Sequence, residues 1–137
     1  MHEQPQPPTL GLTYRVDDLP ISRLQQAKAD TRISVVIPVS NEAATIGQIV
    51  QLIRQDVVDG SGLVDELLVI DSDSSDDTAV IARQAGATVH HARDIRPDLG
   101  WNPGKGEAMW KSLFVSSGDV IVFIDGDLTR FDSRYVT

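Results

Sequence analysis

The sequence contains no cysteine. This absence excludes a disulfide framework, an iron–sulfur cluster and a cysteine nucleophile. Basic residues are also few, because 12 Lys and Arg stand against 20 Asp and Glu and leave a net charge of −8. A non-specific nucleic-acid binder needs a basic surface, so we expect no nucleic-acid partner.

Long apolar runs are absent as well. No run approaches the roughly 20 residues that cross a bilayer, and the N-terminus lacks the apolar stretch of a secretory signal. We therefore expect a cytoplasmic protein with no membrane partner. Hydrophobic residues make up 41% of the 137 positions, which is a globular composition at a length typical of one domain or part of one.

Proline is concentrated at the N-terminus, where residues 1–20 hold four of the seven prolines. We interpret residues 1–31 as an extended, proline-rich arm that ends in a short helix over Ile21–Ala29. Residues 32–137 form the expected structured domain.

From Ile33 onward, strand patterns alternate with helix patterns. Ile33–Val39 is a largely β-branched run, as expected for a strand buried on both faces. A helical period follows Asn41, with apolar residues at 46, 49, 50 and 53. Further strands are predicted over 67–70, 87–90 and 120–124, and further helices over 76–85 and 107–117. The alternation predicts an α/β fold with a Rossmann-like, doubly wound, mostly parallel sheet.

Local signals predict how these helices begin, pack and end. Ser40 or Asn41 is expected to cap the first of them. Gly86 is expected to end the second. The apolar side chains of the third, Trp110, Leu113 and Phe114, are expected to form its packing face.

This topology predicts where a ligand binds. In the strand order 3-2-1-4, the order reverses between the first and fourth strands, and ligands of such sheets bind beyond the carboxyl ends of the strands at that point. The residues there are 38–42 and 125–127, and Asp71 and Ser72 lie on the same edge.

Carboxylates are prominent at this edge. Asp125 and Asp127 flank Gly126, and such a pair can hold Mg²⁺, which one or two carboxylates typically bridge to substrate phosphates. The alternative is a solvated acidic turn. The loop after Asp71 is rich in capping residues, but capping does not explain Asp71, which could also bond a nucleobase or ribose. Glu42 could contact a ligand or complement a helix dipole.

Lys105 lies between two glycines at a predicted helix N-terminus, a position that favours phosphate binding. A lysine on a flexible turn is the alternative. The segment is not a Walker A loop, because Gly100 is one residue too close to Lys105. His90 and His91 project to opposite faces of a strand, and we assign them no role.

Four segments together resemble nucleotide-sugar-dependent glycosyltransferases of the GT-A fold. Within that group the sequence is most similar to the retaining glucosyl-3-phosphoglycerate synthases. The segments are ISVVIPVSNEAATI from Ile33, VDELLVIDSDSSDDT from Val64, NPGKGEAMW from Asn102 and GDVIVFIDGDL from Gly118.

The resemblance implies UDP-glucose as donor, 3-phosphoglycerate as acceptor and retention of configuration. It also implies a Mg²⁺ or Mn²⁺ cofactor and allows a homodimer. Asp127 would bind the metal. The donor nucleotide-sugar would be bound by nine residues: Pro38, Val39, Ser40, Glu42, Asp71, Ser72, Lys105, Asp125 and Gly126. Of these, Ser72 would bond the uracil, Lys105 would contact the uridine or diphosphate, and Asp125 would face the ribose and sugar.

The chain ends ten residues after Asp127. In GT-A enzymes the third metal ligand and the acceptor pocket belong to the following half. We therefore expect a truncated GT-A domain that binds the donor but is not competent for transfer alone.

Two other function classes remain open. VIVFIDGDLT from Val120 also fits the first motif of haloacid-dehalogenase-like phosphatases, with Asp125 as nucleophile and Asp127 as acid/base. The chain could instead be a catalytically inactive nucleotide-binding fragment. Among transferases, a mannosyl donor is a further alternative.

Overall fold

The computed structural model describes residues 15–137. Residues 1–14 of the predicted arm lie outside the described residues. The helices are α1 (Ile21–Lys28), α2 (Ile46–Ile53), α3 (Thr78–Ala85) and α4 (Lys105–Ser112), with a π-helical segment η2 (Arg54–Gly60) continuing α2. Short 3₁₀ turns are η1 (Val16–Asp18), η3 (Ala92–Asp94), η4 (Pro97–Leu99) and η5 (Ser133–Tyr135). Among residues 15–137, no helix combines the length and the apolar character needed to cross a membrane.

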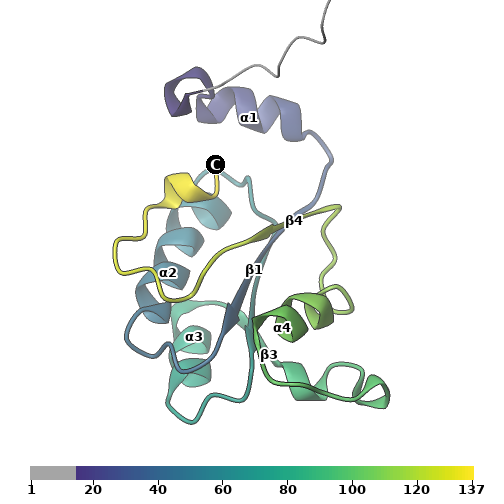
Figure 1. The fold of residues 1–137 in the computed structure, drawn as a ribbon. Coiled ribbons are helices and arrows are strands. Elements are labelled where there is room, and N and C mark those ends of the chain that lie inside the picture. Colours follow the sequence, from purple (N-terminus) through teal and green to yellow (C-terminus); the bar gives the residue numbers. More distant parts are fainter. Residues whose placement is uncertain (1–14) are drawn as a thin grey trace, which may run out of the picture.

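The strands form one sheet of four, in the order β3-β2-β1-β4. They are β1 (Ile33–Val39), β2 (Glu66–Asp71), β3 (Thr88–His91) and β4 (Val120–Phe123), and every pairing is parallel. Val36 of β1 pairs with Leu68 on one side and with Phe123 on the other. The predicted α/β class and strand order are confirmed, and the order reverses between β1 and β4 (Figure 1).

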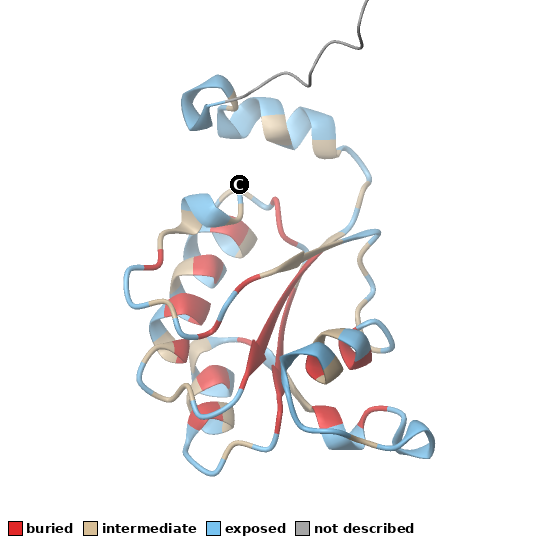
Figure 2. Cartoon of the chain, in the orientation of Figure 1, coloured by how far each residue is buried: buried red, intermediate tan, exposed pale blue. Residues whose placement is uncertain are grey.

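Helices cover both faces of the sheet (Figure 1). Val35, Ile37 and Val39 of β1 belong to the buried cluster that includes the apolar side of α2. Val36, between them, packs into a second cluster with Ala108 of α4. Because alternate strand residues project to opposite faces, the continuous apolar run of β1 serves both layers, and Figure 2 shows it as the buried centre of the molecule.

Helix α1 is joined to the amino ends of the strands through Asp65. This carboxylate accepts a hydrogen bond from the Ile33 amide at 2.8 Å and pairs with Lys28 at 2.9 Å. The Ile33 hydrogen bond, helped by Lys28, lowers the pKa of Asp65. Helix α1 confirms the predicted helix over 21–29 and ends one residue earlier. The division of the chain at residue 31 stays a prediction.

The predicted starts of α2 and α3 are wrong. Helix α2 begins at Ile46, and neither Ser40 nor Asn41 caps it. Asn41 instead adopts a left-handed conformation with φ of 55°, and its Oδ1 accepts a hydrogen bond from the Ser75 amide at 2.8 Å. Helix α3 begins at Thr78 rather than Asp76, because the Asp76 carboxylate accepts the Thr78 amide from outside the helix. The end of α3 at Gly86, with φ of 113°, is confirmed.

Helix α4 differs most from its prediction. It begins at Lys105, two residues before the predicted start at residue 107. It ends at Ser112 rather than residue 117, because the next three amides donate to carbonyls three residues back instead of four. Its predicted packing residues Trp110, Leu113 and Phe114 are exposed. The buried stripe is made of Ala108, Lys111 and Ser112. This stripe has the same helical spacing, so periodicity alone could not decide between the two.

Candidate donor-binding site

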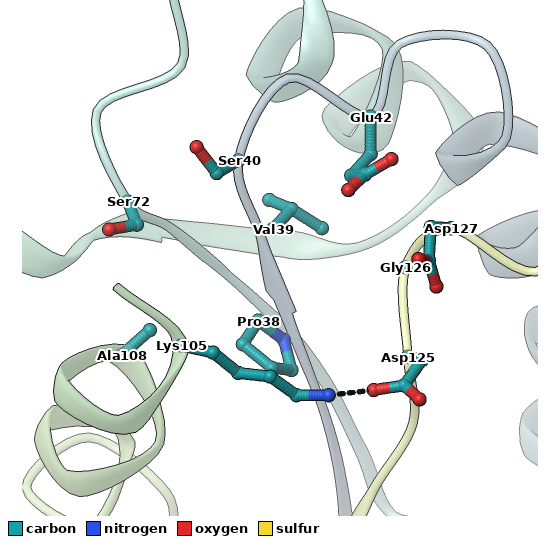
Figure 3. A pocket seen from close by; sticks show the side chains of 10 residues that line it. All are labelled: Pro38, Val39, Ser40, Glu42, Ser72, Lys105, Ala108, Asp125, Gly126 and Asp127. Atoms are coloured by element: carbon teal, nitrogen blue, oxygen red, sulfur yellow. Dashed lines mark hydrogen bonds and ion pairs between the residues drawn. The ribbon is translucent and has the colours of Figure 1, made fainter. Parts of the chain in front are cut away.

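A cavity of about 180 Å³ lies at the carboxyl ends of β1 and β4 and the start of α4. Its walls come from four separate stretches of the sequence (Figure 3). The lining residues are Pro38, Val39, Ser40, Glu42, Ser72, Lys105, Ala108, Asp125, Gly126 and Asp127. The predicted sheet edge therefore holds a real concavity at the point where the strand order reverses.

Two loops are tied together above this edge. The Asn41 amide donates to Ser74 Oγ at 2.9 Å, and the Glu42 amide donates to Thr78 Oγ1 at 2.9 Å. The serine-rich loop after β2 thus holds the loop after β1 in place. The capping residues of this loop are therefore explained by their bonds to the loop after β1, and they need not all contact a ligand.

Glu42 and Asp127 project from facing loops into the cavity (Figure 3). Desolvation raises the pKa of Glu42, and the negative charges of Asp127 and Asp76 raise it further. A carboxylate whose charge is disfavoured in this way gains from a nearby cation. The electrostatics of the cavity rim are therefore suited to a positively charged group.

Gly126 lets the acidic loop approach the sheet closely. A Cβ built on Gly126 would lie 2.7 Å from Val39 Cγ1. The Gly126 carbonyl accepts a hydrogen bond from Thr45 Oγ1 at 2.6 Å. The glycine and this hydrogen bond set the direction in which Asp125 and Asp127 leave β4.

Lys105 forms an ion pair with Asp125 across the cavity (Figure 3). The two side chains are 57% and 51% exposed. Exposed ion pairs contribute little to stability, so this pair can open at low cost. Lys105 is then free to meet an anionic ligand.

Asp71 is the last residue of β2 and Ser72 follows it, but only Ser72 lines the cavity. Ser72 Oγ accepts the Gly104 amide at 3.3 Å. The buried Asp71 carboxylate is already engaged, because it accepts Ser74 Oγ at 2.5 Å and faces His91 Nδ1 at 3.0 Å. In this structure Asp71 holds the loop rather than facing the cavity.

The donor set fits a hard divalent cation. Among residues 15–137 there is no cluster of three or more His, Cys, Asp or Glu that could hold a metal by itself. Mg²⁺, however, usually takes only one or two protein carboxylates and completes its shell with water and substrate phosphates. Asp127 can supply one such oxygen ligand, and the negative charges at the rim favour a cation beside it.

Two contributing residues, Ala108 and Thr45, were not singled out in the sequence, and His91 was assigned no role there. Ala108 lines the cavity one helical turn after Lys105, where helical spacing could have indicated it. His91 contacts Asp71, and both end neighbouring strands in paired register, a signal that required the strand order. Thr45 bonds the Gly126 carbonyl across 81 residues, and no local pattern indicates it.

Comparison with known proteins points to one family. The family model described as Glycosyl transferase family 2 matches residues 34–134. A glucosyl-3-phosphoglycerate synthase of Mycobacterium tuberculosis is 47% identical over 119 residues, which are 87% of this chain and 36% of that protein. The chain thus spans about a third of the length of such curated relatives.

Solved structures agree with the sequence match. The mannosyl-3-phosphoglycerate synthase of Rubrobacter xylanophilus superposes with a TM-score of 0.82 at 34% identity, over 88% of this chain and 40% of that one. The Mycobacterium tuberculosis enzyme in complex with Mn²⁺, UDP-glucose and phosphoglyceric acid superposes with a TM-score of 0.72 at 48% identity, over 78% of this chain and 37% of that one. The α/β fold described above matches the GT-A structures of these enzymes. The chain belongs to glycosyl transferase family 2.

Proposed function

We propose that this chain forms the donor-binding region of a hexosyltransferase that moves glucose from UDP-glucose to 3-phosphoglycerate with retention of configuration. The observation that carries the proposal is the convergence of four separated segments on one cavity. Of the ten residues predicted to bind donor or metal, all except Asp71 line it. An acidic turn or a set of helix caps would not require this convergence.

The cavity offers separate groups for the parts of a nucleotide-sugar. Its volume of about 180 Å³ is below the roughly 300–1,000 Å³ of whole ligand pockets, so the ligand extends beyond it. The Ser72 hydroxyl bonds the uracil, and the Lys105 ammonium turns from Asp125 to the diphosphate. Asp125, once released, accepts hydrogen bonds from ribose or sugar hydroxyls.

Asp127 would hold Mg²⁺ or Mn²⁺ beside the diphosphate. When bound, the cation would neutralise negative charge that develops on the departing diphosphate. Glu42 supports this arrangement, because its carboxylate and that of Asp127 repel one another until a positive charge lies near them.

The choice of substrates rests on the relatives. Identity is 47% to a glucosyl-3-phosphoglycerate synthase and 34% to a mannosyl-3-phosphoglycerate synthase, which favours glucose over mannose. Family membership over residues 34–134 includes Asp125 and Asp127 and favours a transferase over a phosphatase. The homodimer, the cytoplasmic location and the inactivity of this chain alone stay predictions.

The test measures ligand binding to the purified chain in two ways, by the change in melting temperature and by calorimetry. The ligands are UDP, UDP-glucose, GDP and ADP, each with and without MnCl₂. A ligand that binds the native state raises the melting temperature by mass action. We expect a rise that is specific to uridine nucleotides and larger with the metal.

A variant separates the metal site from the nucleotide site. Asp127→Asn should abolish the effect of MnCl₂ while some UDP binding remains. Asp56→Asn is the matched control, because Asp56 is an exposed carboxylate on η2 that does not line the cavity. A melting transition that no nucleotide moves would overturn the proposal. Release of inorganic phosphate from a phosphomonoester, lost in Asp125→Asn, would favour the phosphatase instead.

A further inference from the structure

Lys111 is the largest side chain in the described part of the chain that is fully buried. It lies in α4, two residues before the exposed Leu113, on the face that packs against the sheet. A lysine is almost never fully buried unless its ammonium is paired. The burial of Lys111 therefore calls for a physical reason.

The ammonium is satisfied by backbone rather than by an acid. Lys111 Nζ donates to the carbonyls of Ile95 at 2.5 Å, Arg96 at 3.0 Å and Gly100 at 2.8 Å. These three bonds use all three donors of an ammonium. One side chain thus gathers both ends of the turn that contains η4 (Pro97–Leu99).

This turn has a backbone that needs external support. Arg96 has φ of 45°, a left-handed conformation that is unfavourable for a side chain other than glycine, and Gly100 has φ of 77°. The Arg96 guanidinium is engaged with Asp98 rather than with the sheet. Apolar and stacking contacts also join the turn to α4 and the residues after it, because Ile95 packs in one cluster with Ala108 and the Arg96 guanidinium lies 5.3 Å from the centroid of the Phe114 ring. Lys111 adds three hydrogen bonds to this contact.

The anchored turn leads directly into the donor cavity. Residues 100–104 run from Gly100, held by Lys111, to Gly104, whose amide donates to Ser72 Oγ. The next residue is Lys105, which reaches into the cavity. Lys111 itself does not line the cavity, and it lies about 9 Å farther along the helix axis at ~1.5 Å per residue.

We infer that Lys111 is a positioning residue for the nucleotide-diphosphate site. Its ammonium fixes the turn over residues 95–100, and this turn sets the approach of Gly104 and Lys105 to Ser72 and the ligand. The inference rests on the proposed function, because the ligand is taken to be a uridine diphosphate.

The main test is Lys111→Met, which keeps an unbranched side chain and removes every donor. Val57→Ala is the control, because Val57 is buried in the other core cluster, beyond the opposite face of the sheet. Both variants should melt at a lower temperature. With MnCl₂ present, UDP should bind Lys111→Met more weakly by about tenfold or more, whereas Val57→Ala should keep the wild-type affinity.

A second measurement needs no ligand. Amide hydrogen exchange over residues 95–104 should accelerate by about tenfold or more in Lys111→Met, relative to exchange over β2, and not in Val57→Ala. Unchanged exchange would overturn the anchoring role. Faster exchange with unchanged UDP affinity would overturn the positioning role, and so would an equal loss of UDP affinity in both variants.

Lys111→Gln covers the case in which Lys111→Met does not fold. This variant keeps two N–H donors without a charge, so both readouts should lie between those of the wild type and full loss. Wild-type values in both readouts would overturn the inference. If the wild-type chain does not bind UDP, the proposed function fails and the site role of Lys111 fails with it, while the exchange measurement still decides whether Lys111 holds the turn.

Discussion

Lys105 and Asp125 form an ion pair in which more than half of each side chain is exposed. Such a pair adds little to the free energy of unfolding. The pair matters because it places the Lys105 ammonium beside Ser72 and the acidic loop that follows β4. We therefore expect Lys105 to affect ligand binding more than the free energy of unfolding.

Lys105→Ala tests this separation. Loss of a hydrogen bond to a charged group costs about 1.5–3 kcal/mol, so we expect UDP affinity to fall by about tenfold or more, with little change in melting temperature. Arg23→Ala is the control for net charge, because Arg23 is exposed on α1 at the amino ends of the strands. Calorimetry with UDP measures the affinity of both variants, and melting curves measure their stability. An equal loss of UDP affinity in the two variants would show a general charge effect.

Gly126 and Gly106 make a second pair at this scale. A Cβ at Gly126 would lie 2.7 Å from Val39 Cγ1, whereas a Cβ at Gly106, inside α4, would meet nothing within 4 Å. We expect Gly126→Ala to destabilise the chain by about 1–3 kcal/mol through overpacking. Gly106→Ala should stabilise it by about 0.5–1 kcal/mol through helix propensity. Urea unfolding monitored by circular dichroism compares them, and equal effects would refute the packing argument.

At the level of an element, Asp65 is one of the residues that dock α1, together with Gln25, which donates to the Ser61 carbonyl at 2.7 Å, and Leu24, which packs against the core. Asp65 joins Lys28 of α1 to the first amide of β1. The pKa of its carboxyl is lowered in the folded state. A carboxyl of this kind contributes stability above its ordinary pKa, and that contribution is lost as the pH falls through the folded pKa.

The pH dependence follows from this sign. At about pH 6, Asp65→Asn should melt below the wild type, and the difference should shrink as the pH falls below the ordinary value of 3.8. Asp56→Asn, on the exposed surface of η2, should match the wild type throughout. Melting curves between about pH 2 and 6 measure this, and a difference that does not depend on pH would contradict an electrostatic role for Asp65.

On the surface of the whole molecule, exposed apolar side chains are grouped on α4 and the two residues that follow it. Trp110 and Phe114 contact edge to face, with centroids 5.4 Å apart, and Leu113 beside them is 55% exposed. Apolar side chains grouped on a surface favour association.

We expect the purified chain to self-associate through this face as its concentration rises. The double variant Trp110→Arg and Leu113→Lys should lower the apparent mass in sedimentation velocity without lowering the melting temperature. Val80→Lys on α3 is the control, because Val80 is an exposed apolar residue on another helix. If the two variants reduce association equally, charge rather than this face is responsible.

Much of the fold and of the site could be predicted from local pattern. The apolar run of β1 and the later strands established the α/β class, because burial on both faces demands continuous apolar residues. Strand order then placed Ser40, Ser72 and Asp127 at one edge, because parallel strands end together. The predicted start of α2 was wrong, because Asn41 bonds Ser75 in a neighbouring loop, and such a long-range partner leaves no local signal. The predicted start of α3 was wrong by two residues, because Asp76 accepts the Thr78 amide from outside the helix.

Local sequence patterns were thus sufficient to predict which segments form the sheet and which residues gather at its carboxyl edge. These features follow from hydrophobic periodicity and chain topology, which are local or nearly so. Which face of α4 is buried depends instead on contacts with the rest of the fold. An aromatic stripe and a stripe containing Lys111 had equal spacing, and the second is buried because three carbonyls from another turn satisfy its ammonium. That compensation exists only once the turn over residues 95–100 has folded against the helix, and no pattern within α4 encodes it.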